Sequence, residues 1–210
     1  MATIDTEVTI LGGGCAGLSL AVRLAGSGLR VTVIEPRLEY EDDRVWSFFR
    51  TRPDPLAACV QASWSKWNVS SGGVKMPRTS DRLSYEGVSS GAFYQLALQI
   101  CDAAPNVDLR LGTWVLADPR PPAIDVPWRV ETSAGQLTSR YVIDTRPTGR
   151  TSGYGQSFLG QEIPVGFDAF DPDDVPMMCF AAPHRDRVDF VYILPFTRDA
   201  ALVAVTTFGA

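Results

Sequence analysis

A glycine-rich loop, Gly12–Gly17, restricts the fold of this chain more than any other feature of its sequence. It follows an apolar run at Glu7–Leu11 and leads into Ala16–Ala25, where apolar residues recur at helical spacing. A second apolar run, Arg30–Glu35, comes after glycines of the kind that end helices. Strand, helix and strand in this order predict a βαβ unit, and such a unit requires a parallel sheet.

The loop fits the pattern G-x-G-x-x-G, in which Gly12, Gly14 and Gly17 are the three glycines. In a dinucleotide-binding unit, the first glycine permits the tight turn and the second lets the backbone approach a pyrophosphate. The third lets the helix pack closely on the sheet. The pyrophosphate lies at the helix N-terminus, where free N–H groups and the helix dipole favour an anion. We therefore expect an adenine dinucleotide at this loop.

An acidic residue, Glu35, ends the second predicted strand at the distance from Gly17 where an acid can bind the ribose hydroxyls. Because an acid disfavours a 2′-phosphate, the pattern argues against NADP in this position. The loop alone does not separate FAD from NAD. The alternative interpretation of the whole pattern is a glycine turn followed by a surface glutamate.

Composition and charge exclude several classes of partner. The net charge is −5 and the basic residues do not cluster, which argues against nucleic acid. No apolar run is long enough to span a bilayer, and the N-terminus lacks the pattern of a signal peptide, so a cytoplasmic location is expected. Four widely spaced cysteines and one histidine, His184, argue for free thiols and against a metal site. His184 lies in a polar segment and is expected at the surface.

Beyond the βαβ unit, Ser89–Ala103 has the capping residue and the apolar stripe of a helix. Residues 37–82 are rich in Pro, Gly, Ser and Trp and are expected to be irregular. Short apolar or alternating runs, one pair of them around an Ala-Gly turn, predict strands at Val107–Leu111, Trp128–Thr132, Gln136–Ser139, Tyr141–Asp144, Gln161–Val165, Asp189–Pro195 and Ala201–Thr207.

Several segments resemble the lycopene cyclase family of flavoproteins, and they come in the family's order along nearly the whole chain. The segment D-R-V-W-S-F-F is similar to the family's D-R-T-W-S-F-W, and L-V-A-V-T is similar to L-V-E-x-T. The resemblance rests on Asp43–Phe49, Ser90–Tyr94, Val142–Pro147, Gly155–Glu162, Phe190–Phe196 and Leu202–Thr206.

The resemblance implies FAD as the cofactor, NADPH as a reductant and an acyclic carotenoid such as lycopene as the substrate. The implied reaction belongs to carotenoid biosynthesis. An acid protonates the ψ end group, and the resulting cation closes to a β-ionone ring beside reduced FAD, without net redox change. A membrane-dissolved substrate also implies peripheral contact with a membrane.

Three charged residues are candidates for the flavin side of such a site. Arg44 lies in the D-R-V-W segment, and Asp144 and Arg146 follow a predicted strand, where ligands bind at the carboxyl edge of a parallel sheet. The alternative for Asp144 and Arg146 is a surface ion pair.

The chain departs from the family at its acid. Ala204 stands where the family's L-V-E-x-T has glutamate, and alanine can neither donate nor accept a proton. Glu162 and Asp189, on predicted strands expected near Ala204, are the candidate replacement acids; the alternative for each is a carboxylate at a strand edge. The chain is also shorter than the family usually is, which points to a fragment.

The sequence therefore predicts an α/β protein. A Rossmann-like FAD-binding βαβ domain with inserted loop and β-hairpin segments is expected at 1–149, and the start of an antiparallel substrate-binding sheet at 150–210. Two alternative functions remain open. One is a flavin-dependent monooxygenase or prenyl reductase on the same fold, and the other is an inactive, truncated flavin-binding homologue.

Overall fold

The computed structural model describes residues 4–120, 123, 126–147, 153–180 and 185–209. The chain divides into two compact units. The first contains residues 1–44, 54–59 and 89–148, and the second contains 45–53, 60–88 and 149–210. Two segments that the sequence assigned to a domain at 1–149 therefore belong to the second unit. His184, expected at the surface, lies outside the described residues.

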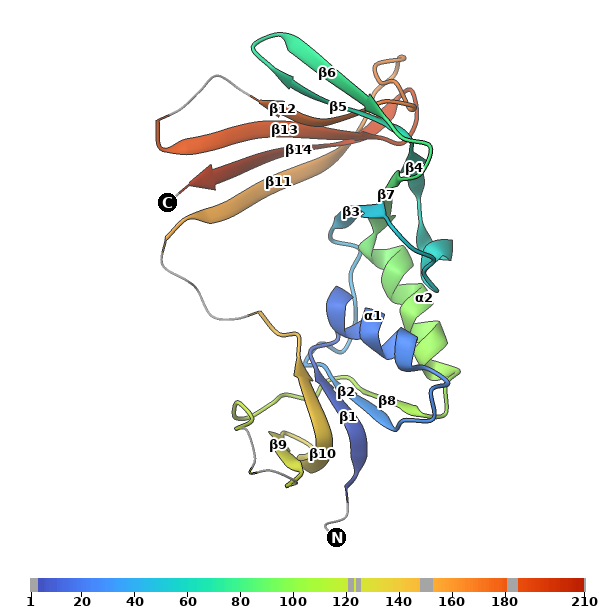
Figure 1. Cartoon of the computed structure of the whole chain (residues 1–210), viewed down its shortest axis with the longest axis vertical. Helices are drawn as coiled ribbons and strands as arrows, with labels where there is room; N and C mark the ends of the chain where they lie inside the picture. Colours follow the sequence, from blue (N-terminus) through green and yellow to red (C-terminus); the bar gives the residue numbers. More distant parts are fainter. Residues whose placement is uncertain (1–3, 121–122, 124–125, 148–152, 181–184, 210) are drawn as a thin grey trace. The chain divides into compact units, whose positions relative to one another are not determined.

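A five-stranded sheet forms the centre of the first unit, in the order β8-β2-β1-β10-β9 (Figure 1). β1 pairs in parallel with both β2 and β10, whereas β9 and β10 form an antiparallel hairpin. The bounds are β1 (Thr6–Leu11), β2 (Val31–Ile34), β8 (Val107–Arg110), β9 (Trp128–Thr132) and β10 (Gly135–Asp144). The expected βαβ unit is confirmed, and its parallel strands are almost fully buried, as strands covered on both faces are.

Two helices, α1 (Cys15–Leu24) and α2 (Ser90–Asp102), contact each other in this unit. α1 buries Leu18, Ala21 and Val22, which recur on one face at helical spacing. The N-cap of α2 is Ser89, whose hydroxyl accepts a hydrogen bond of 3.2 Å from the N–H of Ala92. This contact is the expected N-cap, and it satisfies a backbone donor that the helix cannot.

The second unit contains two sheets (Figure 1). The larger has the order β11-β14-β13-β12-β5-β6 and the smaller has the order β3-β7-β4. Trp64, Val175, Leu194 and Leu202 form a buried apolar cluster. The indole N–H of Trp64 donates to the carbonyl of Pro195 at 3.2 Å. The bounds are β3 (Val45–Arg50), β4 (Ala62–Trp64), β5 (Lys66–Ser71), β6 (Val74–Thr79), β7 (Ser84–Ser89), β11 (Gly155–Pro164), β12 (Val175–Phe180), β13 (Arg187–Pro195) and β14 (Ala200–Gly209); a short 3-10 helix, η1, spans Ala57–Cys59.

The expectation of irregular structure at 37–82 is wrong, because β3, β4, β5 and β6 lie there. All four strands are short, and β6 is exposed along its whole length and contains Pro77, so the segment lacks a clear alternating pattern. β5 joins the larger sheet by pairing in parallel with β12, where Trp67 lies opposite Val175. A partner so distant along the chain leaves no local signal. The runs Gln136–Ser139 and Tyr141–Asp144 are likewise parts of one strand, β10.

Candidate functional site

Three separate parts of the chain meet at the carboxyl end of β1. Leu11, the last residue of β1, pairs with Ile34 of β2 on one side and with Asp144 of β10 on the other. The chain passes from β1 to β2 and then to β8 on one side, and returns to β10 on the other side (Figure 1). The strand order thus reverses at β1, and open α/β sheets bind their ligands at such a point.

The glycine loop has the geometry that its three glycines require. Gly12 has a φ of +96°, a backbone conformation that favours glycine. A Cβ at Gly17 would lie 1.9 Å from the carbonyl oxygen of Gly12, so α1 can approach β1 this closely only with glycine. A Cβ at Gly14 would meet only the Nη2 of Arg37, at 4.0 Å, which leaves open space beside the backbone.

The N-terminus of α1 faces this open space with its backbone donors. Gly14 is the N-cap, no side chain caps the helix, and the first turn carries no acidic residue. Free N–H groups at a helix N-terminus, together with the helix dipole, attract an anion. The open backbone at Gly14 and these donors fit a pyrophosphate, and they are the residues that would hold one.

Glu35 follows β2 and is buried, with only 3% of its surface exposed. Its Oε2 accepts hydrogen bonds from the N–H of Gly13 at 2.6 Å and from Nη2 of Arg37 at 3.2 Å. Its Oε1 accepts from the backbone N–H of Arg37 at 2.9 Å and from Nε at 2.8 Å. Burial by itself would raise the pKa of Glu35, but these hydrogen bonds outweigh it and hold the pKa below its ordinary value.

Two tyrosines complete this part of the site. The guanidinium of Arg37 lies over the rings of Tyr40 and Tyr94, 4.5 and 5.5 Å from their centroids. The hydroxyl of Tyr40 donates to the carbonyl of Gly13 at 2.9 Å, and burial raises the pKa of this phenol. Arg37, Tyr40 and Tyr94 were not among the site residues predicted from the sequence. The available signals were the position of Arg37 beside Glu35 and the S-x-x-F-Y segment that contains Tyr94.

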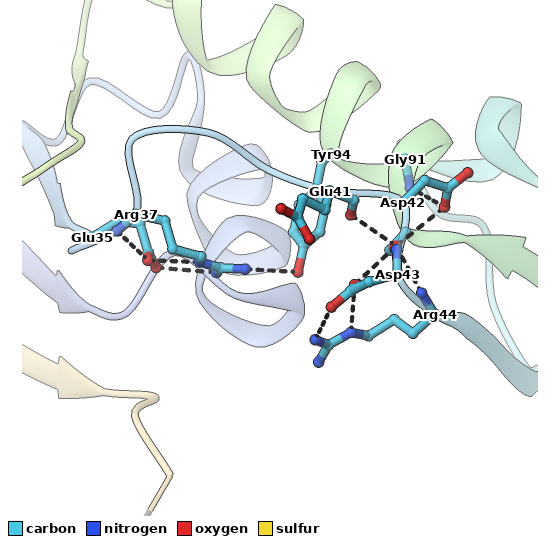
Figure 2. Close-up of polar contacts among 9 residues, drawn as sticks. Glu35, Arg37, Glu41, Asp42, Asp43, Arg44, Gly91 and Tyr94 are labelled. Atoms are coloured by element: carbon cyan, nitrogen blue, oxygen red, sulfur yellow. Dashed lines mark hydrogen bonds and ion pairs between the residues drawn. The ribbon is translucent and has the colours of Figure 1, made fainter. Parts of the chain in front are cut away.

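Residues 41–44 cross the N-terminus of α2, as Figure 2 shows. The hydroxyl of Ser90 accepts from the backbone N–H of Asp43 at 2.9 Å and of Arg44 at 3.2 Å, and it donates to the carbonyl of Glu41 at 3.1 Å. The carboxylate of Asp42 accepts from the N–H of Gly91 at 2.7 Å. These contacts fix the backbone on which Arg44 stands.

The side chain of Arg44 pairs with its neighbour Asp43, with 2.8 Å between Nε and Oδ1 (Figure 2). The pair is half exposed. The hydrogen bonds that Arg44 donates to Asp43 raise the pKa of Arg44 and lower the pKa of Asp43. Arg44 is therefore a fixed cation on the segment that runs from the glycine-loop region to β3.

Asp144 and Arg146 pair with each other at the end of β10. Nε and Nη2 of Arg146 donate to the two carboxylate oxygens at 2.9 and 2.7 Å, and Nη2 also donates to Asp118 at 2.8 Å. Thr145, between them, donates its hydroxyl to the carbonyls of Leu11 at 2.9 Å and Gly12 at 3.0 Å. Asp144 and Arg146 thus form an ion pair, as the alternative interpretation of the sequence predicted, and they also lie beside the glycine loop.

The two candidate acids lie in the second unit, on opposite faces of the larger sheet. Ala204 of β14 is fully buried and lies opposite Gly160 of β11 and Tyr192 of β13. Glu162 lies opposite Leu202, and since side chains alternate along a strand, it shares the face of Ala204. Asp189 lies opposite Thr207 and therefore belongs to the other face. Its carboxylate accepts from Arg187 at 2.7 Å and from Thr207 at 2.8 Å.

Within the described residues, no helix is long and apolar enough to cross a membrane. Among the same residues, no three His, Cys, Asp or Glu side chains are grouped so that they could bind a metal ion.

The fold and the glycine loop define an α/β protein of the type found in FAD-dependent monooxygenases and reductases. The fold resembles that of p-nitrophenol 4-monooxygenase PnpA from Pseudomonas putida, with a TM-score of 0.63, 16% identity and coverage of 97% of this chain and 58% of that chain. It also resembles that of a geranylgeranyl bacteriochlorophyll reductase-like protein from Thermoplasma acidophilum, with a TM-score of 0.62, 14% identity and coverage of 96% of this chain and 56% of that chain. A third similar structure is PqsL, a probable FAD-dependent monooxygenase from Pseudomonas aeruginosa, with a TM-score of 0.63, 15% identity and coverage of 96% of this chain and 60% of that chain.

The particular family follows from the sequence. The family described as lycopene cyclase protein matches residues 7–210, and the chain belongs to this family. A search of curated proteins finds no match. The chain spans 56 to 60% of the length of the three solved structures above.

Proposed function

We propose that the chain belongs to a flavoprotein that binds FAD in its first unit and cyclises the ψ end groups of lycopene or a related acyclic carotenoid. The observation that carries the FAD part is the open backbone at Gly14 beside the uncapped N-terminus of α1, with Glu35 at the end of the next strand. Membership of the lycopene cyclase family supports the carotenoid part.

In this proposal, the residues of the first unit bind and orient the cofactor. The N–H groups at the start of α1 hold the pyrophosphate, and Glu35 accepts hydrogen bonds from the ribose hydroxyls. Arg44, Asp144 and Arg146 are proposed for the side of the site nearest the flavin. Reduced FAD, kept reduced by NADPH, supplies an electron-rich surface that stabilises positive charge.

The cyclisation needs an acid that protonates the terminal double bond, and Ala204 cannot supply it. Of the two candidate acids, we propose Glu162 rather than Asp189. Glu162 shares the face of Ala204, whereas Asp189 lies on the other face and is bound by Arg187 and Thr207. After ring closure, the same carboxylate can accept the proton that leaves the ring, so the reaction needs no net redox change.

Since lycopene is dissolved in membranes, we propose that the protein is cytoplasmic and contacts the membrane peripherally. A float assay tests this contact directly. The protein should co-migrate with vesicles that contain lycopene, and recovery only in the soluble fraction would contradict it.

Two experiments test the proposed function separately. Equilibrium titration, read by quenching of flavin fluorescence, tests whether the purified chain binds FAD. For the reaction, the chain is expressed in a lycopene-accumulating bacterium and the pigments are separated by chromatography. β-Carotene or γ-carotene is the expected product, and Glu162→Gln should abolish it.

Position 204 offers a matched pair of variants. Ala204→Glu restores an acid at the position where the family has one, and Ala204→Gln adds the same length without the acid. A product made only by Ala204→Glu would show that the natural chain lacks the acid and would rule out Glu162. Unchanged lycopene in all strains, with FAD bound, would overturn the cyclase proposal.

Ala204 itself favours a second candidate, a flavin-binding homologue without cyclase activity. This candidate predicts FAD binding with no cyclised product in the natural chain. A third reaction class, flavin-dependent oxygenation or reduction on this fold, would consume NADPH in proportion to product, which a cyclase does not.

A further inference from the structure

The carboxylate of Glu35 has no acceptor position left for a ligand in the free protein. A carboxylate offers about four lone-pair sites. The four hydrogen bonds from Gly13 and Arg37 use two on each oxygen, and the side chain is only 4% exposed. A ribose hydroxyl can therefore reach Glu35 only if Arg37 withdraws at least part of its side chain.

The guanidinium of Arg37 borders the space where the pyrophosphate is expected. Its Nη2 is the nearest atom to the ideal Cβ position of Gly14, at 4.0 Å, and its side chain is 40% exposed. Two observations thus concern the guanidinium of Arg37. It is hydrogen-bonded to the carboxylate of Glu35, which is expected to bind the ribose, and it borders the open backbone beside the N-terminus of α1.

We propose that Arg37 is a phosphate-binding residue that Glu35 holds in the free protein and releases when the cofactor binds. In the free protein the guanidinium neutralises the buried carboxylate. In the complex it offsets one of the two negative charges of the pyrophosphate, and the ribose hydroxyls take its place as hydrogen-bond donors to Glu35. This inference rests on the proposed binding of FAD and assigns a specific residue to it.

Tyr40 and Tyr94 suit such a movement. Their rings lie 4.3 Å apart at the centroids and both face the guanidinium. Aromatic faces attract a cation without fixing it in one direction. The guanidinium can therefore turn from the carboxylate towards the pyrophosphate while it remains over at least one ring. Removal of the guanidinium should have opposite effects on the two halves of the ligand.

The test compares ADP with adenosine, which lacks the phosphates. Calorimetric titration measures both ligands with the natural chain and with Arg37→Gln, which keeps the backbone N–H that binds Glu35. We expect Arg37→Gln to bind ADP about tenfold more weakly or worse, the loss typical of a charge-assisted contact. We expect it to bind adenosine at least as tightly as the natural chain, because Glu35 becomes free for the ribose.

Arg30→Gln is the matched control, since it removes the same charge from the surface pair with Glu7 at the start of β2. It should change neither affinity. Arg37→Lys keeps the charge and should retain most of the preference for ADP. Urea unfolding of each variant shows whether the fold is intact.

The outcomes separate this inference from the proposed function. If the natural chain binds ADP and Arg37→Gln weakens ADP and adenosine equally, Arg37 only positions Glu35 and the exchange is overturned. Unchanged affinities in Arg37→Gln would overturn it as well. If the natural chain binds neither FAD nor ADP, the proposed cofactor site itself fails, and the exchange fails with it.

Discussion

The backbone carbonyl of Gly12 lies against the Cα of Gly17, so that a Cβ on Gly17 would be 1.9 Å from the carbonyl oxygen. Gly14, in the same loop, has open space instead, with its nearest neighbour 4.0 Å from the ideal Cβ position. The two glycines therefore serve different purposes. Gly17 permits α1 to pack on β1, and Gly14 leaves room for a ligand.

Gly17→Ala should destabilise the fold. The added methyl group meets backbone rather than a flexible side chain, so α1 must move away from β1, and overpacking of this kind costs about 1–3 kcal/mol. Urea unfolding followed by circular dichroism measures the change. Binding of FAD should fall as well, because the helix N-terminus moves with α1. An unfolding free energy equal to that of the natural chain would contradict the observed packing.

Gly14→Ala should weaken cofactor binding without destabilising the fold. The methyl group enters open space in the free protein, so the free energy of unfolding should change by less than about 1 kcal/mol. The same methyl group stands where the pyrophosphate must approach the backbone, so FAD and ADP should bind at least tenfold more weakly. Strong FAD binding by a folded Gly14→Ala variant would place the pyrophosphate elsewhere.

Glu35→Gln should destabilise the free protein in a manner that depends on pH. Hydrogen bonds hold the pKa of Glu35 below its ordinary value of 4.5. The stabilisation is therefore fully present above pH 4.5 and is lost as the pH falls through the lower pKa of the folded state. At pH 7 the loss should be about 1–3 kcal/mol, as for a buried charged group that loses its partner.

Urea unfolding at a series of pH values measures the difference between Glu35→Gln and the natural chain. The difference should shrink as the solution is acidified below pH 4.5. Glu7→Gln is a control at the exposed pair with Arg30, whose hydrogen bonds lower the pKa of Glu7 to about 2. It should show a smaller difference at pH 7. A difference for Glu35→Gln that does not vary with pH would contradict the role of the ionised carboxylate.

Ser90→Ala should release residues 41–44 from α2. The Ser90 hydroxyl is buried and accepts from the N–H groups of Asp43 and Arg44, so its removal leaves both without this acceptor, at a cost of about 1–3 kcal/mol. Ser89→Ala, which removes only the helix cap, should cost about 1 kcal/mol. Limited proteolysis distinguishes them, since cleavage near Arg44 should accelerate in Ser90→Ala alone. Equal cleavage in the two variants would show that Ser90 does not hold this segment.

The cysteines should differ in reactivity. Burial raises the pKa of the Cys101 thiol to about 11, while Cys179 is only half buried. The neutral Cys101 thiol therefore favours the fold below its ordinary pKa of 9.0, and this contribution is lost as the pH rises through about 11. At pH 8, iodoacetamide should label Cys179 in the native protein well before Cys101, as mass spectrometry can follow. Equal labelling without urea would contradict the burial.

The sequence predicts the glycine loop and the βαβ unit well because their signals are local. The turn, the helix and the buried strands each depend on residues within a few positions, and the bounds of α1 agree with the expected helix to within one or two residues at each end. The N-cap of α2 at Ser89 is local for the same reason.

Other features exist only in the tertiary structure. Neither the pairing of Trp67 with Val175 nor the shared face of Glu162 and Ala204 leaves a mark within one segment, since each depends on sheet register. The contacts of Arg37 with Tyr94 likewise join residues far apart in the sequence. Local patterns in the sequence thus predict the βαβ unit with its glycine loop, and the order of the motifs along the chain indicates the family. The pairing of Arg37 with Glu35 is local, but the hydrogen bond from Gly13 to Glu35 and the position of Arg37 over Tyr94 are not. They exist because long-range packing brings β2, α2 and the glycine loop together.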